Sequence, residues 1–191
     1  NNNKNKVDIV VVFRGTEVKN LRNIIADLNI FPQKLKGKCK GCKVHKGFYK
    51  AYHTIRKQIL SELKAEIRKQ NRKGNSIENL YYTGHSLGAA MASIGVYDFF
   101  KKKSKDIIGE HFELIPNVSI VTFGSPKVGN SKFVKYMNKK GLFKYNLRVV
   151  YGLDIITKLP PGRFYGHFGD MVHFPRNEYL HPRVSKRKIF K

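Results

Sequence analysis

Gly84-His85-Ser86-Leu87-Gly88 is the stretch that decides the fold of this chain, because it fits the pattern Gly-x-Ser-x-Gly. In this motif the serine lies on a tight, strained turn between a strand and a helix, where its hydroxyl stands clear of the backbone. The small residues two positions before and after the serine let strand and helix approach closely. The pattern is common by chance, so its meaning depends on the sequence around it.

The flanking residues supply the strand and the helix that the motif requires. Residues 77–83, directly before it, form a short run rich in β-forming side chains. Residues 87–100, directly after it, combine small residues with apolar residues at helical spacing. We therefore predict the nucleophile elbow of an α/β hydrolase, with Ser86 as the catalytic nucleophile.

Strands and helices alternate along the rest of the chain. Further strands are predicted over 7–13, 117–123, 147–151 and 171–174, with helices over 17–31, 45–72 and near 130–140. Apart from Asp8 the run 7–13 is apolar, which is typical of a central strand covered on both faces. The alternation predicts a mostly parallel sheet with helices on both faces. We expect a single α/β-hydrolase domain over residues 1–191, and truncation at one or both ends stays open.

The charge of the chain suggests an anionic partner without specifying one. The formal net charge is +25, with 28 lysines and 10 arginines among the 38 basic residues. Base-reading sites favour arginine, and no nucleic-acid recognition motif accompanies the lysines, so we expect no nucleic-acid partner. A solvated surface and attraction to an anionic membrane surface are the two interpretations that remain.

Cys39 and Cys42 lie in a Lys/Gly-rich loop at residues 33–43. Two thiols do not complete a structural zinc site, and a redox motif should open a helix after a strand. A local disulfide and a pair of free thiols both remain possible. We predict no metal and no cofactor. The sequence contains no run of about 18 apolar residues, so it predicts no membrane span.

A serine nucleophile needs a histidine that takes its proton and an acid that orients the histidine. In this fold the order along the chain is serine, acid, histidine. Asp154 directly follows the strand 147–151 and is the preferred acid, with Asp170 as its competitor. The histidines beyond Asp154 are His167, His173 and His181. We predict His181 as the base because it lies on a loop past the last strand; His173 and a base beyond the end of the chain are the alternatives.

The oxyanion hole needs two donors. One is the backbone N–H of Leu87, directly after the nucleophile. Thr16 follows the strand 7–13 through Arg14 and Gly15 and is placed to supply the other. A threonine at this position would equally suit a helix cap, and both roles are compatible.

Several motifs in the same order resemble the class 3 lipases, a family of fungal triacylglycerol lipases that also includes feruloyl esterases. The resemblance rests on the segments 11–16, 21–28, 43–48, 83–90, 123–129 and 154–161. It implies Ser86 as nucleophile, Asp154 as acid, and Thr16 with Leu87 as oxyanion donors.

The resemblance also implies that the stripe within 17–31 is a lid helix. Leu21, Ile24, Ile25 and Leu28 form its narrow apolar face. A closed lid would cover the site, and an open one would lay these side chains against lipid at a lipid–water interface. An ordinary surface helix packed on the core is the alternative.

The expected activity is that of a lipase-type serine carboxylester hydrolase that cleaves acylglycerols; phospholipase and feruloyl-esterase-like specificities stay open. The histidine context departs from the family, because His181 precedes Pro182 instead of an apolar, aromatic segment. A catalytically inactive lipase-like module that binds lipid or an acidic surface is therefore the alternative. The family resemblance and the possible disulfide favour a secreted or vesicular location.

Overall fold

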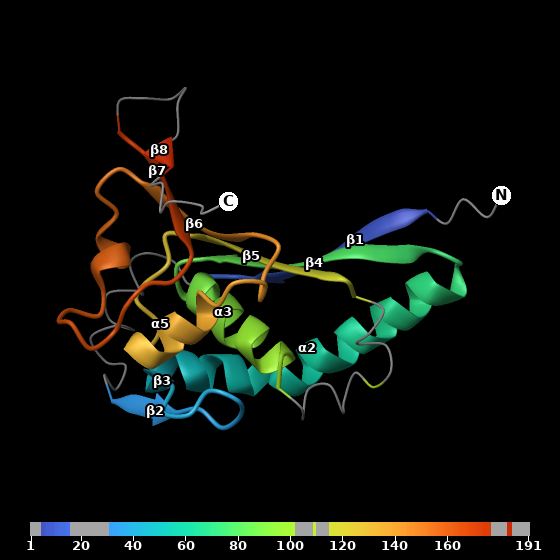
Figure 1. Ribbon diagram of the computed structural model, residues 1–191, viewed down its shortest axis with the longest axis horizontal. Coiled ribbons are helices and arrows are strands. Elements are labelled where there is room, and N and C mark those ends of the chain that lie inside the picture. The colour runs from blue at the N-terminus through green and yellow to red at the C-terminus, as the bar shows by residue number, and fades with distance from the viewer. Residues whose placement is uncertain (1–4, 16–30, 102–108, 110–114, 177–182, 185–191) are drawn as a thin grey trace.

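The computed structural model describes residues 5–15, 31–101, 109, 115–176 and 183–184 (Figure 1). One sheet has the strand order β1-β4-β5-β6-β7-β8. Its strands are β1 (Lys6–Phe13), β4 (Ser76–His85), β5 (Asn117–Phe123), β6 (Asn146–Tyr151), β7 (Asp170–Phe174) and β8 (Arg183–Val184). Each neighbouring pair from β1 to β7 is parallel, and β8 pairs antiparallel with β7. The predicted mostly parallel sheet is confirmed.

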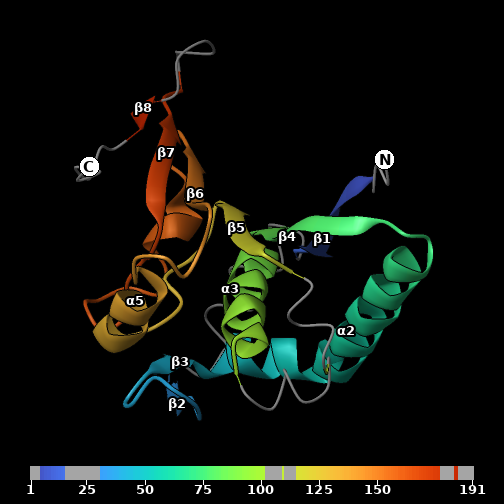
Figure 2. The ribbon, with the colours of Figure 1, turned by 45° about the vertical axis from the view of Figure 1, so that its right-hand side comes forward.

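The helices that connect these strands lie on one side of the sheet in both views (Figures 1 and 2). They are α2 (Lys46–Arg72), α3 (Leu87–Phe99) and α5 (Ser131–Met137). The strand order steps in one direction from β1 through β4 and β5 to β6. Because parallel crossovers are right-handed, successive steps in one direction place their helices on the same face. Within the described ranges, the opposite face therefore carries no helix.

The expectation that β1 is a central strand covered on both faces is wrong for the described sheet. β1 is its outermost strand. Val10 and Val12 are 54% and 66% exposed, whereas Phe13 is buried. Successive side chains of a strand point to opposite faces, and in the described part of the chain only one of those faces packs on helices. A continuous valine run fits a half-covered edge strand as well as a central one.

The core lies between the sheet and the helices. The rings of Phe13, Tyr52 and Tyr82 meet there, with centroids 6.2 and 6.3 Å from that of Phe13. Among these apolar groups α3 buries the carboxylate of Asp98, which accepts hydrogen bonds from Arg56 Nε at 2.7 Å and Tyr52 Oη at 3.0 Å. This pairing ties α2 to α3, the helix that begins at the elbow.

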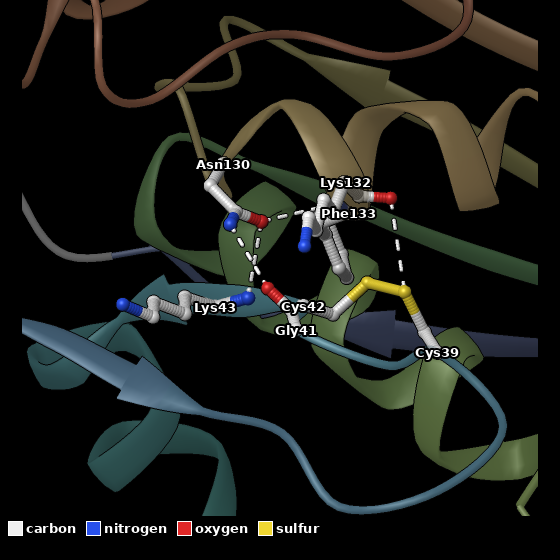
Figure 3. Close-up of a disulfide and its surroundings, with 7 residues drawn as sticks. All are labelled: Cys39, Gly41, Cys42, Lys43, Asn130, Lys132 and Phe133. Atoms are coloured by element: carbon white, nitrogen blue, oxygen red, sulfur yellow. Dashed lines mark hydrogen bonds between the residues drawn. A yellow bond between two sulfur atoms is a disulfide. The ribbon is translucent and has the colours of Figure 1, made fainter.

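The segment expected to be a basic loop at 33–43 contains a hairpin. β2 (Pro32–Lys34) pairs antiparallel with β3 (Lys43–His45), and Cys39 and Cys42 form a disulfide in the connection between them. The local-disulfide interpretation is therefore the one that the structure adopts. Figure 3 shows how Asn130, directly before α5, fastens this connection: its side chain accepts from the N–H of Lys43 and donates to the carbonyl of Gly41.

Several predicted residues lie outside the described ranges. They are Thr16, the apolar stripe Leu21, Ile24, Ile25 and Leu28, and His181. Among the helices that are described, none is long and apolar enough to cross a membrane.

Candidate functional site

Ser86 lies on the turn between β4 and α3, as the motif predicts. Its backbone has φ 57° and ψ −120°, and it is the only non-glycine residue with positive φ within the described ranges. Its N–H donates to the carbonyl of Phe123 at 3.0 Å, which anchors the turn to the end of β5. Left-handed backbone costs an L-residue about 1–2 kcal/mol, so the surrounding structure holds the serine in a strained position.

The small residues around Ser86 permit close contact between strand, helix and the end of β1. A Cβ at Gly84 would lie 2.5 Å from the carbonyl oxygen of Gly88, and a Cβ at Gly88 would overlap the carbonyl of Phe13. A Cβ at Gly15 would lie 2.5 Å from the carbonyl oxygen of His85. The end of β1 is thus pressed against the elbow, and the chain leaves this contact toward Thr16.

The hydroxyl of Ser86 is buried and, within the described part of the chain, has no hydrogen-bond partner. Leu87 is the first residue of α3. Backbone N–H groups in the first turn of a helix have no partner inside the helix and carry its positive dipole end. The serine therefore stands beside donors that suit a developing negative charge.

Asp154 lies just past β6, the second strand from β4 in the sheet. One carboxylate oxygen, Oδ1, accepts from the N–H of Ile156 at 3.0 Å and caps the short helix η2 (Ile155–Lys158). The other, Oδ2, lies beside Gly124 together with Nε2 of His85: a Cβ at Gly124 would be 2.6 and 3.2 Å from these atoms. The carboxyl ends of β4, β5 and β6 thus bring Ser86, Gly124 and Asp154 to one edge.

Asp170, the competing acid, is the first residue of β7. Because β7 runs parallel to β6, its first residue lies at the opposite end of the sheet from the residues that follow β4 and β6. Asp170 is exposed there and is removed from Ser86. The topology favours Asp154.

Two of the histidines beyond Asp154 are engaged with backbone carbonyls. His167 Nε2 lies 2.7 Å from the carbonyl oxygen of Thr157, and His173 Nε2 lies 2.9 Å from that of Gly152. Burial, reinforced by the nearby Arg148 guanidinium, lowers the pKa of His167 to about 4. His167 is therefore a hydrogen-bonding histidine, and neither it nor His173 is bonded to Ser86.

Two features of this region escaped sequence reasoning. Gly124 directly follows the predicted strand 117–123, and its missing side chain makes room for the Asp154 carboxylate. Leu153 and Ile155, on either side of Asp154, are 83% and 53% exposed, and Phe123 is 43% exposed. The sequence signal for this apolar rim is the placement of an apolar residue on each side of Asp154. No cluster of His, Cys, Asp or Glu within the described ranges could hold a metal ion.

The comparison with known proteins agrees with this geometry. The family model described as Lipase (class 3) matches residues 10–164, which include the elbow, Gly124 and Asp154. The chain belongs to the class 3 lipase family. The resemblance to class 3 lipases that the motifs indicated and the predicted α/β-hydrolase fold are both confirmed.

Relatives of this class 3 lipase family member include a phospholipase and an acylglycerol lipase. A chloroplastic phospholipase A(1) of Arabidopsis thaliana is 34% identical over 164 residues, which cover 80% of this chain and 34% of the relative. A secreted mono- and diacylglycerol lipase of Penicillium cyclopium is 32% identical over 152 residues, covering 80% of this chain and 43% of the relative. The chain thus spans less than half the length of these two relatives.

A solved triacylglycerol lipase, described as having a serine protease triad at its catalytic centre, has the same fold. It superposes with a TM-score of 0.69 at 28% identity, covering 87% of this chain and 57% of the lipase. The superposition thus covers most of this chain and a little over half of that lipase.

Proposed function

We propose that this chain carries the nucleophile and the acid of a lipase-type serine carboxylester hydrolase, as a single α/β-hydrolase domain over residues 1–191. The observation that carries the proposal is the strained backbone of Ser86, whose buried hydroxyl has no partner in the described structure. Such strain persists where a site requires it. The donors at the start of α3 and the carboxylate of Asp154 at the same sheet edge support the same conclusion.

The reaction proceeds through an acyl-enzyme. Ser86 Oγ attacks the ester carbonyl carbon, and the catalytic histidine takes the hydroxyl proton and passes it to the departing alcohol. Asp154 orients that histidine, and the N–H groups of Leu87 and Thr16 stabilise the oxyanion. Water then attacks the acyl-enzyme and releases the fatty acid. No step requires a metal or a cofactor.

The proposed base is His181. His181 remains the candidate within this chain, because His167 and His173 are bonded to backbone carbonyls. The alternative is a histidine that follows the last residue of this sequence in a longer chain. Relatives are longer than the part that this chain matches, which leaves room for that alternative.

A lipid ester at a lipid–water interface is the proposed substrate. The apolar rim around Asp154 supports this, since Leu153, Ile155 and Phe123 present apolar surface beside the reacting groups. The stripe of Leu21, Ile24, Ile25 and Leu28 is proposed as the lid that covers them. Acylglycerols and phospholipids are both candidate substrates, in keeping with the two kinds of relative.

A secreted or vesicular location, with attraction to an anionic membrane surface, belongs to the same proposal. The secreted Penicillium relative supports a secreted protein, whereas the chloroplastic Arabidopsis relative shows that the family also works inside cells. The net charge of +25 supports attraction to anionic lipid, and we propose no nucleic-acid partner.

An inactive lipase-like module that binds lipid or an acidic surface is the second candidate function, because no histidine among the described residues is bonded to the Ser86 hydroxyl.

The test is labelling with a fluorophosphonate probe, followed by tributyrin hydrolysis below and above its solubility limit. We expect label on the wild type and on Ser125→Ala, a nearby buried serine, and none on Ser86→Ala. Turnover that rises when droplets form supports a lidded lipase. Loss of turnover in His181→Ala, with retention in His173→Ala, supports His181 as the base. A folded chain that neither takes the label nor hydrolyses tributyrin would favour the binding module.

A further inference from the structure

Two lysine-rich segments that are far apart in the sequence meet on one side of the molecule. Residues 31–45, which contain the β2–β3 hairpin, include five lysines and no acidic residue. Residues 131–144, which contain α5 and the turn after it, likewise include five lysines and no acidic residue. None of the ion pairs formed between described residues involves these ten lysines.

The contact between the two segments is fixed by several bonds. Asn130 Oδ1 accepts from the N–H groups of Lys43 and Phe133, both at 3.1 Å, and its Nδ2 donates to the carbonyl of Gly41 at 3.0 Å. Sγ of Cys39 lies 3.7 Å from the carbonyl oxygen of Lys132 (Figure 3). The disulfide closes the lysine-bearing connection of the hairpin on itself, and Asn130 clamps that connection against the first turn of α5.

The clamp brings like charges together. The side chain of Lys132 extends over Gly41, because its Nζ lies 3.0 Å from where a Cβ of Gly41 would be. Lys38 and Lys40 flank Cys39 on the same connection and are exposed. Cations held together without an acidic partner repel one another, and an anion bound between them would relieve that repulsion.

Exposed aromatic side chains lie at the start of the hairpin segment and on the chain that packs along α5. Phe31 precedes β2 and is 68% exposed, and Phe164 is 48% exposed. Phe164 lies with Lys135 and Arg163 along an open groove of about 480 Å³ beside α5. Cations interspersed with aromatic rings are typical of surfaces that lie at a membrane interface.

We propose that this hairpin–helix surface, made of Phe31, Lys38, Lys40, Lys132, Lys135, Arg163 and Phe164, docks the protein on membranes whose lipid headgroups carry net negative charge. The lysines are attracted to that charge as point charges, and the two phenylalanines enter the headgroup layer. The inference rests on the proposed function in one respect: such docking would deliver the ester hydrolase to its substrate. The surface itself is separate from Ser86 and Asp154.

The experiment measures binding of the whole chain to sedimented vesicles made of ether-linked lipids, so that ester hydrolysis plays no part. Vesicles of neutral phosphatidylcholine are compared with vesicles that also contain phosphatidylserine. The first variant is Lys38→Gln, Lys40→Gln, Lys132→Gln. Its matched control is Lys57→Gln, Lys69→Gln, Lys73→Gln, which removes the same charge from exposed positions on α2 and directly after it.

We expect binding to the anionic vesicles alone, weakening as salt is raised. One lysine close to such a surface contributes about fivefold to partitioning, so the hairpin–helix variant should bind about a hundredfold more weakly and the control far less so. Equal losses in the two variants, or binding that salt does not change, would overturn the proposal. Because the lipids cannot be hydrolysed, these results are independent of whether Ser86 is catalytically active.

A second comparison separates a membrane from nucleic acid. Phe31→Ser with Phe164→Ser should weaken binding to anionic vesicles and leave binding to a DNA duplex unchanged. If the double variant binds vesicles normally and the wild type prefers the duplex, the occupant is nucleic acid and the membrane proposal is wrong. Hydrolysis of a soluble short-chain ester should be unchanged in the hairpin–helix variant, because its lysines lie away from the reacting groups.

Discussion

The carboxylate of Asp154 lies directly against the backbone of Gly124, in a space that a methyl group would fill. A Cβ on Gly124 would be 2.6 Å from Asp154 Oδ2. Gly124 also has φ 53°, and its N–H donates to the carbonyl of Val149 at 2.9 Å. The residue after β5 therefore sets the position of the acid that follows β6.

Gly124→Ala should damage both stability and catalysis. The left-handed backbone costs an alanine about 1–2 kcal/mol, and the added methyl displaces the carboxylate. A displacement of this kind lowers activity by about a hundredfold where the acid orients the base. The measurements are urea unfolding and ester hydrolysis.

Gly141→Ala is the matched control for this prediction. Gly141 has φ 79° with nothing within 4 Å of its Cβ position, so it carries the conformational cost without the collision. It should lose about 1 kcal/mol and keep its activity. If Gly124→Ala is as active as Gly141→Ala, Asp154 is not held by this contact.

Ser86→Gly should be more stable than Ser86→Ala by about 1–2 kcal/mol, because glycine accepts positive φ and alanine keeps the strain of the serine. Both variants remove the nucleophile, so both should lack activity and fluorophosphonate labelling. Chemical denaturation of the two proteins gives the difference directly. Equal stabilities would show that φ 57° at this turn stores little strain.

The sequence predicts well those features that depend on local periodicity. The elbow strand and helix follow from the small and apolar residues that flank Ser86, and Asp154 follows from its place directly after a strand. Parallel order follows from the alternation of elements. These features depend on residues that are close together in the chain, so they can be predicted from a single sequence.

Features that depend on distant contacts were not predictable in the same way. A valine run is compatible with a strand that has one covered face or two, so the sequence did not predict that β1 lies at the edge of the sheet. The contact of Gly124 with Asp154, and the hairpin fastened by Asn130, join residues far apart in the chain.

Asn130→Ala should destabilise the protein by about 2 kcal/mol. Asn130 caps α5 through Phe133 and also joins it to the hairpin through Lys43 and Gly41. Loss of an N-cap alone costs about 1 kcal/mol of stability, and loss of each of the two further hydrogen bonds costs about 0.5 kcal/mol more. Asn130→Asp keeps the accepting oxygen and should lose less than half as much in urea unfolding. Equal losses in the two variants would mean that the donated bond to Gly41 dominates.

His167 should make stability depend on pH. Burial, followed by the charge of Arg148, lowers its folded pKa to about 4, below its value of about 6.5 in an unfolded chain. Between these two values the unfolded state binds more protons than the folded state, so the free energy of unfolding rises with pH across this window. The contribution of His167 is complete above about pH 6.5 and is lost as the pH falls toward 4.

His167→Gln isolates this contribution, because a glutamine amide can still donate to the carbonyl of Thr157 and does not titrate. Urea unfolding of wild type and variant is compared at pH 7 and pH 5. The wild type should lose more stability than the variant on acidification, by about 2 kcal/mol in the difference. The carboxylates and the other histidines are common to both proteins and cancel. If both proteins lose the same stability, His167 is protonated as readily in the folded state as in the unfolded chain.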